Sequence, residues 1–134
     1  MKPNAMVMIE TLKCFSDARG VVVEPMGPQE LSCQRNAHLV LTAPGGVRGN
    51  HYHRRGTEVF VLMGPALVRL REGQGNPIRD VLVDPGQVMR FLIPPGVTHS
   101  IQNTGQEPLV VLAFNTDAHD PQAPDVVRDV LIPT

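Results

Sequence analysis

Glycine and proline recur at short intervals along this chain and divide most of it into short apolar runs. The sequence holds 12 glycines and 13 prolines among 134 residues. The runs between these turn residues are rich in valine, leucine, isoleucine and phenylalanine, and they lie at 38–42, 58–63, 66–71, 80–83, 88–93, 99–103 and 109–114. Short β-branched runs bounded by turn residues are typical of antiparallel strands, and no window shows a helical period over three turns. The chain is therefore predicted to be all-β, a small antiparallel β-sandwich or barrel.

The length of the chain suits one domain with one core. We expect residues 1–134 to form that domain, with about residues 1–16 as an N-terminal strand or arm. One short helix is expected at 123–131, where APDVVRDVL places Pro and Asp near a helix start. A barrel of this kind exposes sheet edges, which an N-terminal strand exchanged or added between two chains would cover. We therefore expect a homodimer.

Charge and composition exclude several classes of partner. The net charge is −1, which gives no electrostatic reason to expect nucleic acid or an anionic membrane surface as partner. The apolar runs are too short to cross a bilayer, and residues 1–13 lack the pattern of a secretory signal. Cys14 and Cys33 form no CxxC pair and are expected to be reduced thiols. A cytoplasmic protein is therefore expected.

Two of the five histidines stand one residue apart in GNHYHRRGTE, between two expected strands. Side chains alternate along a strand, so His51 and His53 project to one side with Tyr52 opposite. The RRG that follows is turn chemistry, and a hairpin there would bring Glu58 back beside the two imidazoles. A lone carboxylate on an apolar interior face costs several kcal/mol unless it is paired or binds a metal. Together these residues indicate a divalent cation site.

A third imidazole is expected to complete this set from a distant strand. His99 follows a Pro-Pro-Gly turn in IPPGVTHSIQN, and a β-sandwich brings distant strands together. His38 and His119 join no such pattern. Three histidines and one glutamate suit Zn, Mn, Fe, Ni or Co, so the residue types alone do not decide the metal. They leave such an ion with one or two open positions, as in catalytic or ligand-binding sites.

At these residues the sequence resembles the cupin superfamily, which has a jelly-roll or double-stranded β-helix fold. The first cupin motif is matched by Gly45, His51, His53, Glu58 and Gly64, and the second by Gly86, Pro94, Gly96, His99 and Asn103. The two motifs stand at about the expected separation, which makes the combined match specific. By this resemblance, His51, His53, Glu58 and His99 correspond to the metal ligands.

A narrower resemblance runs from about residue 17 to the C-terminus. RGNHYH (48–53) and the DPxxPD pattern at 120–125 look like the C-terminal cupin domain of bacterial two-domain enzymes. Those enzymes make UDP-linked deoxy-aminosugars for capsular polysaccharide. Their cupin domain binds zinc and epimerises a 4-keto sugar before a reductase domain reduces it. The segment NTDAH (115–119) departs from the family, which usually has Asn, an acidic residue, an apolar residue and Phe there.

This resemblance implies a zinc-dependent epimerase or isomerase acting on a nucleotide-linked keto sugar through a metal-stabilised enediolate. Arg48 would meet a diphosphate, and Phe60 would belong to the apolar wall that excludes water from the substrate. The base is not identified, and Glu58 and His119 are the candidates. Two alternatives stay open. One is a metal-dependent dioxygenase, since related cupins use the same ligands. The other is a non-catalytic module that binds a small ligand, because these 134 residues hold no counterpart of the reductase domain.

Overall fold

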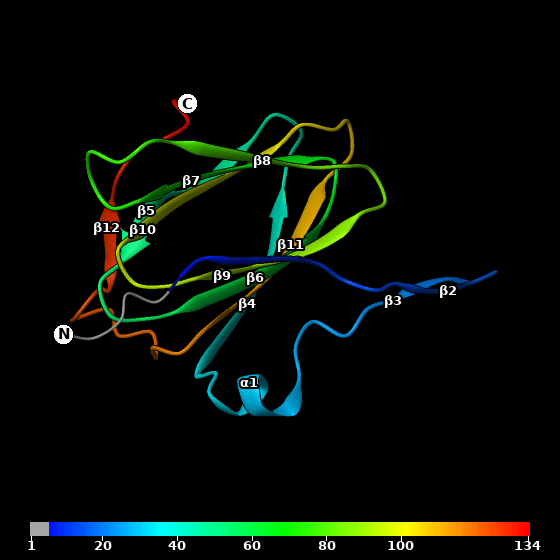
Figure 1. The fold of residues 1–134 in the computed structure, drawn as a ribbon, viewed down its shortest axis with the longest axis horizontal. Coiled ribbons are helices and arrows are strands. Elements are labelled where there is room, and N and C mark those ends of the chain that lie inside the picture. Colours follow the sequence, from blue (N-terminus) through cyan, green and yellow to red (C-terminus); the bar gives the residue numbers. More distant parts are fainter. Residues whose placement is uncertain (1–5) are drawn as a thin grey trace.

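Two five-stranded antiparallel sheets face each other and enclose one core (Figure 1). The computed structural model describes residues 6–134, so residues 1–5 of the expected N-terminal arm lie outside the described residues. The first sheet has the order β1 (Met8–Thr11), β9 (Val88–Ile93), β6 (Glu58–Met63), β11 (Leu109–Asn115) and β4 (Asn36–Thr42). The second has the order β12 (Val126–Arg128), β5 (Val47–His53), β10 (Val97–Asn103), β7 (Ala66–Glu72) and β8 (Arg79–Val83). The predicted all-β sandwich is confirmed.

The core fills the space between the two sheets. Along β6, Phe60 and Leu62 point inward, at 1% and 2% exposure, as the two-residue period of a strand requires. The ring of Phe60 stacks on Phe91 of β9, with 4.9 Å between ring centroids. Val68 and Leu70 of β7 close the same core from the second sheet. This packing supports one end of β6, and Glu58 stands at the other end of that strand.

The helix expected at 123–131 is wrong. Residues Val126–Arg128 form β12, which pairs antiparallel with β5. The backbone of this β-branched segment completes an otherwise open edge of the second sheet, and that pairing outweighs the weak helix signal. The helix in the described part of the chain is α1 (Pro28–Ser32) instead. This helix begins with proline at its first position. The Glu30 carboxylate accepts a hydrogen bond from the N–H of Gly27 and so caps the helix start.

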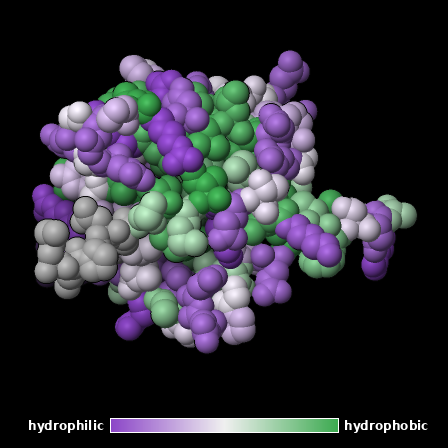
Figure 2. All heavy atoms as spheres, viewed as in Figure 1, coloured by the Kyte–Doolittle hydropathy of each residue, from purple (hydrophilic) through white to green (hydrophobic). Residues whose placement is uncertain are grey.

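The N-terminal region divides into a docked strand and a projecting hairpin. Strand β1 pairs with β9 of the same chain. The hairpin of β2 (Phe15–Asp17) and β3 (Gly20–Val22) extends away from the body of the molecule (Figures 1 and 2). Its apolar side chains Phe15 and Val22 are 57% and 71% exposed. In residues 6–134 no helix has the length and apolar character needed to span a membrane.

Candidate metal centre and pocket

The structure brings His51, His53, Glu58 and His99 together between the two sheets. One ligand atom from each of the four lies within 4.8 Å of all the others. Donors about 2.0–2.2 Å from a single ion are separated by about 3.3–4.4 Å, so the cluster has nearly the span that one ion requires. The two imidazoles of β5 and the one of β10 belong to the second sheet, and the glutamate belongs to β6 of the first.

The expected hairpin between the first two histidines and the glutamate is wrong. Strands β5 and β6 belong to different sheets and do not pair with each other. The RRG segment therefore carries the chain across from one sheet to the other. Glu58 reaches the imidazoles across the interior of the sandwich, and not as their neighbour in a hairpin. The side chains still meet because β5 ends and β6 begins at the same end of the sandwich.

Glu58 is the centre of the cluster. Its Oε2 lies 2.5 Å from Nε2 of His99 and 3.5 Å from Nε2 of His53. The ring centroid of His51 lies 5.1 Å from that of His53 and 4.7 Å from that of His99. The side chains of His53, Glu58 and His99 are 10%, 16% and 3% exposed, so water gives this carboxylate little stabilisation.

Burial and charge act in opposite directions on these groups. Burial, together with the neighbouring His99, lowers the pKa of His51 to about 4, so its imidazole is neutral at physiological pH. Burial would raise the pKa of Glu58, but His99 and His53 outweigh it and hold that pKa well below its usual range. Burial would lower the pKa of His53, but the carboxylates of Glu58 and Asp125 raise it instead. The centre thus holds a buried anion that needs a cation beside it.

The donor atoms fit a divalent ion. Nε2 of His53, Nε2 of His99 and Oε2 of Glu58 are buried, and although they lie close to one another, none of them forms a hydrogen bond of normal geometry. Buried polar atoms of this kind are rare unless something else binds them. Nδ1 of His99 lies 3.1 Å from the carbonyl oxygen of Val97, which holds the ring with Nε2 toward the cluster. Three imidazoles and a carboxylate form a donor set that suits zinc and its neighbours.

A distorted stretch of β5 sets the direction of its histidines. Gly49 has φ +90°, and a Cβ there would lie 2.6 Å from the carbonyl oxygen of His99, so a side chain does not fit. Asn50 also has a positive φ, of 57°. The pairing of β5 with β10 shifts register between His99 and Ser100. This bulge explains the residues that precede the first histidine of RGNHYH, because it re-aims the strand just before the ligands.

Asn50 joins this bulge to the C-terminal segment. Its Oδ1 accepts hydrogen bonds from the N–H groups of Leu131 and Ile132 and from the hydroxyl of Ser100. Its Nδ2 donates a hydrogen bond to the carbonyl oxygen of Ile132. Replacing Asn50 with alanine leaves two buried N–H groups without an acceptor, and alanine tolerates the positive φ of this position less well than asparagine does. We expect the free energy of unfolding to fall by about 3 kcal/mol, measured by urea denaturation. Asn50→Gly, which relieves the backbone strain alone, should recover about 1 kcal/mol of that loss. A loss below about 1 kcal/mol in the alanine variant would contradict this role.

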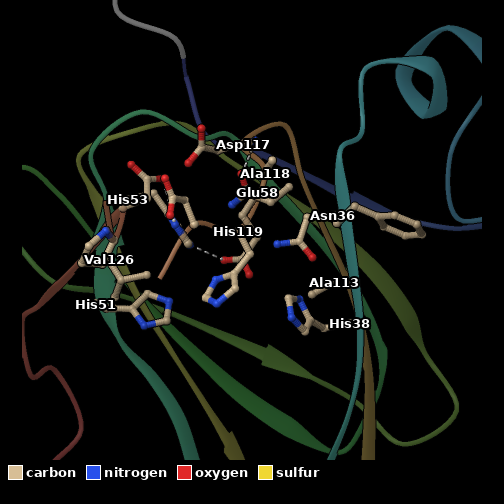
Figure 3. A pocket seen from close by; sticks show the side chains of 15 residues that line it. Asn36, His38, His51, His53, Glu58, Ala113, Asp117, Ala118, His119 and Val126 are labelled. Carbon is tan, nitrogen blue, oxygen red and sulfur yellow. Dashed lines mark hydrogen bonds and ion pairs between the residues drawn. The ribbon is translucent and has the colours of Figure 1, made fainter. Parts of the chain in front are cut away.

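A cavity of about 380 Å³ opens beside the cluster, and two further histidines line it. His38 comes from the inner face of β4, and His119 comes from the loop between β11 and β12. Figure 3 shows the imidazoles of His38, His51 and His119 pointing into the same space. Glu58 borders this space as well. The pocket therefore has imidazoles on walls that face the ligand cluster.

A second cavity, of about 320 Å³, also borders the cluster. It shares His51 and Glu58 with the first cavity, and Phe60 and Ile101 give it an apolar wall. Arg48, which is exposed, stands among its lining residues. Between them the two cavities are lined by all four cluster residues; one adds a cationic group and the other adds two further imidazoles.

Sequence reasoning missed two residues of this region. His38 lies on an expected strand, but only the long-range pairing of β4 with β11 places it at the pocket. Asp125 belongs to the DPxxPD pattern, and its Oδ2 lies 3.3 Å from Nδ1 of His53. The resemblance had marked that pattern without giving it a role. The signal available in the sequence was an acidic residue at the end of a pattern that the resemblance had singled out as specific.

Fold and site together define a cupin-type barrel with a candidate metal centre. The chain belongs to the polysaccharide biosynthesis C-terminal domain family, whose model matches residues 15–127. It is 30% identical over 112 residues to the UDP-2-acetamido-2,6-beta-L-arabino-hexul-4-ose reductase of Pseudomonas aeruginosa. That match covers 82% of this chain and 29% of the relative, so the chain spans less than a third of the relative's length.

Solved structures share this fold. The capsular polysaccharide assembling protein CapF from Staphylococcus aureus superposes with a TM-score of 0.67 at 25% identity, over 91% of this chain and 33% of CapF. A dTDP sugar isomerase from Desulfovibrio desulfuricans superposes with a TM-score of 0.75 at 19% identity, over 91% of this chain and 82% of the isomerase. The predicted resemblance to cupin domains of capsular-polysaccharide enzymes is confirmed.

Proposed function

We propose that this protein is a metal-dependent epimerase or isomerase of a nucleotide-linked keto sugar. The single observation that carries the proposal is the buried cluster of three imidazoles and one carboxylate, open to a pocket lined by further imidazoles. Membership of the polysaccharide biosynthesis family supports the sugar substrate. So does the similarity to a reductase whose name describes a UDP-linked hexulose.

Each part of the site has a role in this proposal. A divalent ion, with zinc as the first candidate, would act there as a Lewis acid toward the ketone oxygen of the substrate. His51, His53, Glu58 and His99 would hold that ion. The apolar side chain of Phe60 keeps water from the adjoining space, which strengthens electrostatic interactions there. The guanidinium of Arg48 is suited to binding the diphosphate.

Proton transfer in this proposal falls to the imidazoles outside the ligand set. Glu58 lies within 3.5 Å of two histidines and has a strongly stabilised negative charge, so it suits a ligand better than a base. His119 and His38 both line the pocket and belong to different elements, the loop after β11 and strand β4. Imidazole exchanges protons readily near neutral pH, as a general base there must. We therefore assign the base to His119, with His38 on the facing wall.

The proposed reaction is tested by proton exchange in deuterium oxide. The zinc-loaded protein would be incubated with a panel of UDP- and dTDP-linked 4-keto sugars, and NMR would follow the proton on the carbon next to the ketone. The proposal expects deuterium at that carbon in at least one sugar, and an inverted or isomerised product. If no sugar of the panel exchanges its proton, the proposal fails. Oxygen uptake without exchange would favour a dioxygenase instead.

Replacing His119 with glutamine is expected to slow this exchange about 10²–10⁴-fold, because general acid–base catalysis contributes about that factor. The measurement is the NMR exchange rate, with zinc content determined on the same sample. Zinc content should stay at the wild-type value, since His119 lies outside the four-residue cluster. His119→Gln with a wild-type exchange rate would remove His119 from the reaction and leave His38 to be tested in the same way.

The protein is further proposed to form a homodimer. The hairpin of β2 and β3 projects from the body with Phe15 and Val22 exposed, and strand β4 stands at the open edge of the first sheet. Leu39 and Leu41 of that strand are 69% and 61% exposed. Apolar arms and sheet edges of this kind are commonly covered by a second copy. Light scattering should give twice the mass of the chain, and a monomer at micromolar concentration would refute the dimer.

A further inference from the structure

The ring of His53 lies between two carboxylates. Its Nε2 is 3.5 Å from Oε2 of Glu58 inside the cluster, and its Nδ1 is 3.3 Å from Oδ2 of Asp125 behind it. The side chain of Asp125 is 9% exposed. Asp125 is also fixed by the backbone: its Oδ1 accepts from the N–H of Arg55 at 2.7 Å, and its Oδ2 accepts from the N–H of Gly56 at 3.0 Å. The position of this carboxylate is therefore set by the segment that crosses between the sheets, independently of the imidazole.

A neutral imidazole has one N–H and one lone pair, and its neighbours decide which nitrogen carries the proton. An ionised carboxylate only accepts hydrogen bonds, so Asp125 favours the tautomer with the proton on Nδ1. The lone pair of Nε2 then points into the cluster. In His99 the corresponding contact is a hydrogen bond, because its Nδ1 lies 3.1 Å from the carbonyl oxygen of Val97, whereas Nδ1 of His53 approaches Asp125 at 3.3 Å without forming one.

We propose that Asp125 is the positioning residue of the metal centre, which holds His53 in the tautomer and orientation that offer Nε2 to the ion. This inference rests on the metal site of the proposed function. It gives the last residue of the DPxxPD pattern a role: the backbone groups of Arg55 and Gly56 hold its carboxylate, and the carboxylate orients the ligand. At 3.3 Å the contact is longer than a charge-assisted hydrogen bond of about 2.7–2.9 Å, and we expect it to shorten when an ion binds Nε2.

Asp125→Asn tests the inference with almost no change in volume. The amide has one acceptor oxygen in place of two. If that oxygen stays on the N–H of Arg55, its NH₂ group faces Nδ1 of His53 and favours the tautomer that cannot bind metal through Nε2. Loss of such a partner weakens metal binding about 10–100-fold, which competition with a zinc chelator measures. Asp117→Asn is the matched control, because Asp117 lies on the same loop and contacts Arg55 at 3.3 Å. It should bind zinc as the wild type does.

A second measurement needs no variant. In wild-type protein with one equivalent of zinc, ¹⁵N NMR of the histidine rings should show His53 protonated at Nδ1 and metal-bound at Nε2. Zinc on Nδ1, or a wild-type zinc affinity in Asp125→Asn, would overturn the role of Asp125 and leave the metal site standing. Failure of the wild-type protein itself to bind zinc would overturn the metal site of the proposed function, and this inference with it.

Discussion

Replacing His51 and His99 together with alanine is expected to abolish metal binding by the purified protein. The two imidazoles supply half of the four-residue cluster and come from two different strands, β5 and β10. Four-ligand zinc sites bind with about 10–16 kcal/mol at neutral pH, so loss of half the ligands removes on the order of 5 kcal/mol or more. That corresponds to a loss in affinity of more than about a thousandfold. Metal content determined by mass spectrometry should fall from one ion per chain to nearly none.

His38→Ala is the matched control for this double variant. His38 is another imidazole of the same pocket, but it lies outside the four-residue cluster. It should retain one ion per chain. Circular dichroism of the double variant would show whether the β-sandwich is still present, since His99 is 2% exposed. Full metal content in a folded double variant would refute the ligand assignment.

Replacing Phe91 with alanine is expected to give a large loss of stability. Phe91 is fully buried and its ring stacks on Phe60 at 4.9 Å, so truncation leaves a cavity in the middle of the core. Phenylalanine-to-alanine changes at such sites cost about 3–5 kcal/mol. Domains of this size are stable by only about 5–15 kcal/mol in total. Urea denaturation should therefore show a midpoint far below that of the wild type.

This change should also reach the metal centre. The ring of Phe60 lies 6.0 Å from that of His99, so loss of its stacking partner loosens the wall behind one ligand. Leu82→Ala is the control, because Leu82 of β8 is 69% exposed, lies outside the surfaces proposed for the dimer, and should change stability by less than about 0.5 kcal/mol when truncated. A loss below about 1 kcal/mol in Phe91→Ala would contradict the proposed core.

The sequence was sufficient to predict most strands of the two large sheets and the convergence of the four cluster residues, but not strands β2, β3 and β12. Turn residues delimit each strand, and the spacing of the two cupin motifs ties His99 to the pair on β5. The predicted hairpin that would bring Glu58 beside the two histidines of β5 was wrong. The RRG segment connects strands of two different sheets. A turn signal shows that the chain changes direction, but which sheet the next strand enters depends on long-range pairing.

Contacts between distant segments were beyond prediction from local patterns. His38 reaches the pocket only because β4 pairs with β11. Asp125 reaches His53 because β12 completes the edge of β5, in a segment whose local pattern favoured a helix. His119 was a candidate from the sequence, and the loop that carries it does line the pocket. Its role in proton transfer stays a prediction.

The most direct test of the metal centre is zinc-edge X-ray absorption of the protein with one equivalent of zinc. We expect only nitrogen and oxygen neighbours at about 2.0–2.2 Å, with the outer-shell scattering of three imidazoles. This result would match His51, His53, His99 and Glu58. Sulfur neighbours at about 2.3 Å would indicate binding by Cys14 or Cys33 instead. Either those sulfur neighbours or a spectrum without imidazole scattering would contradict the four-residue centre.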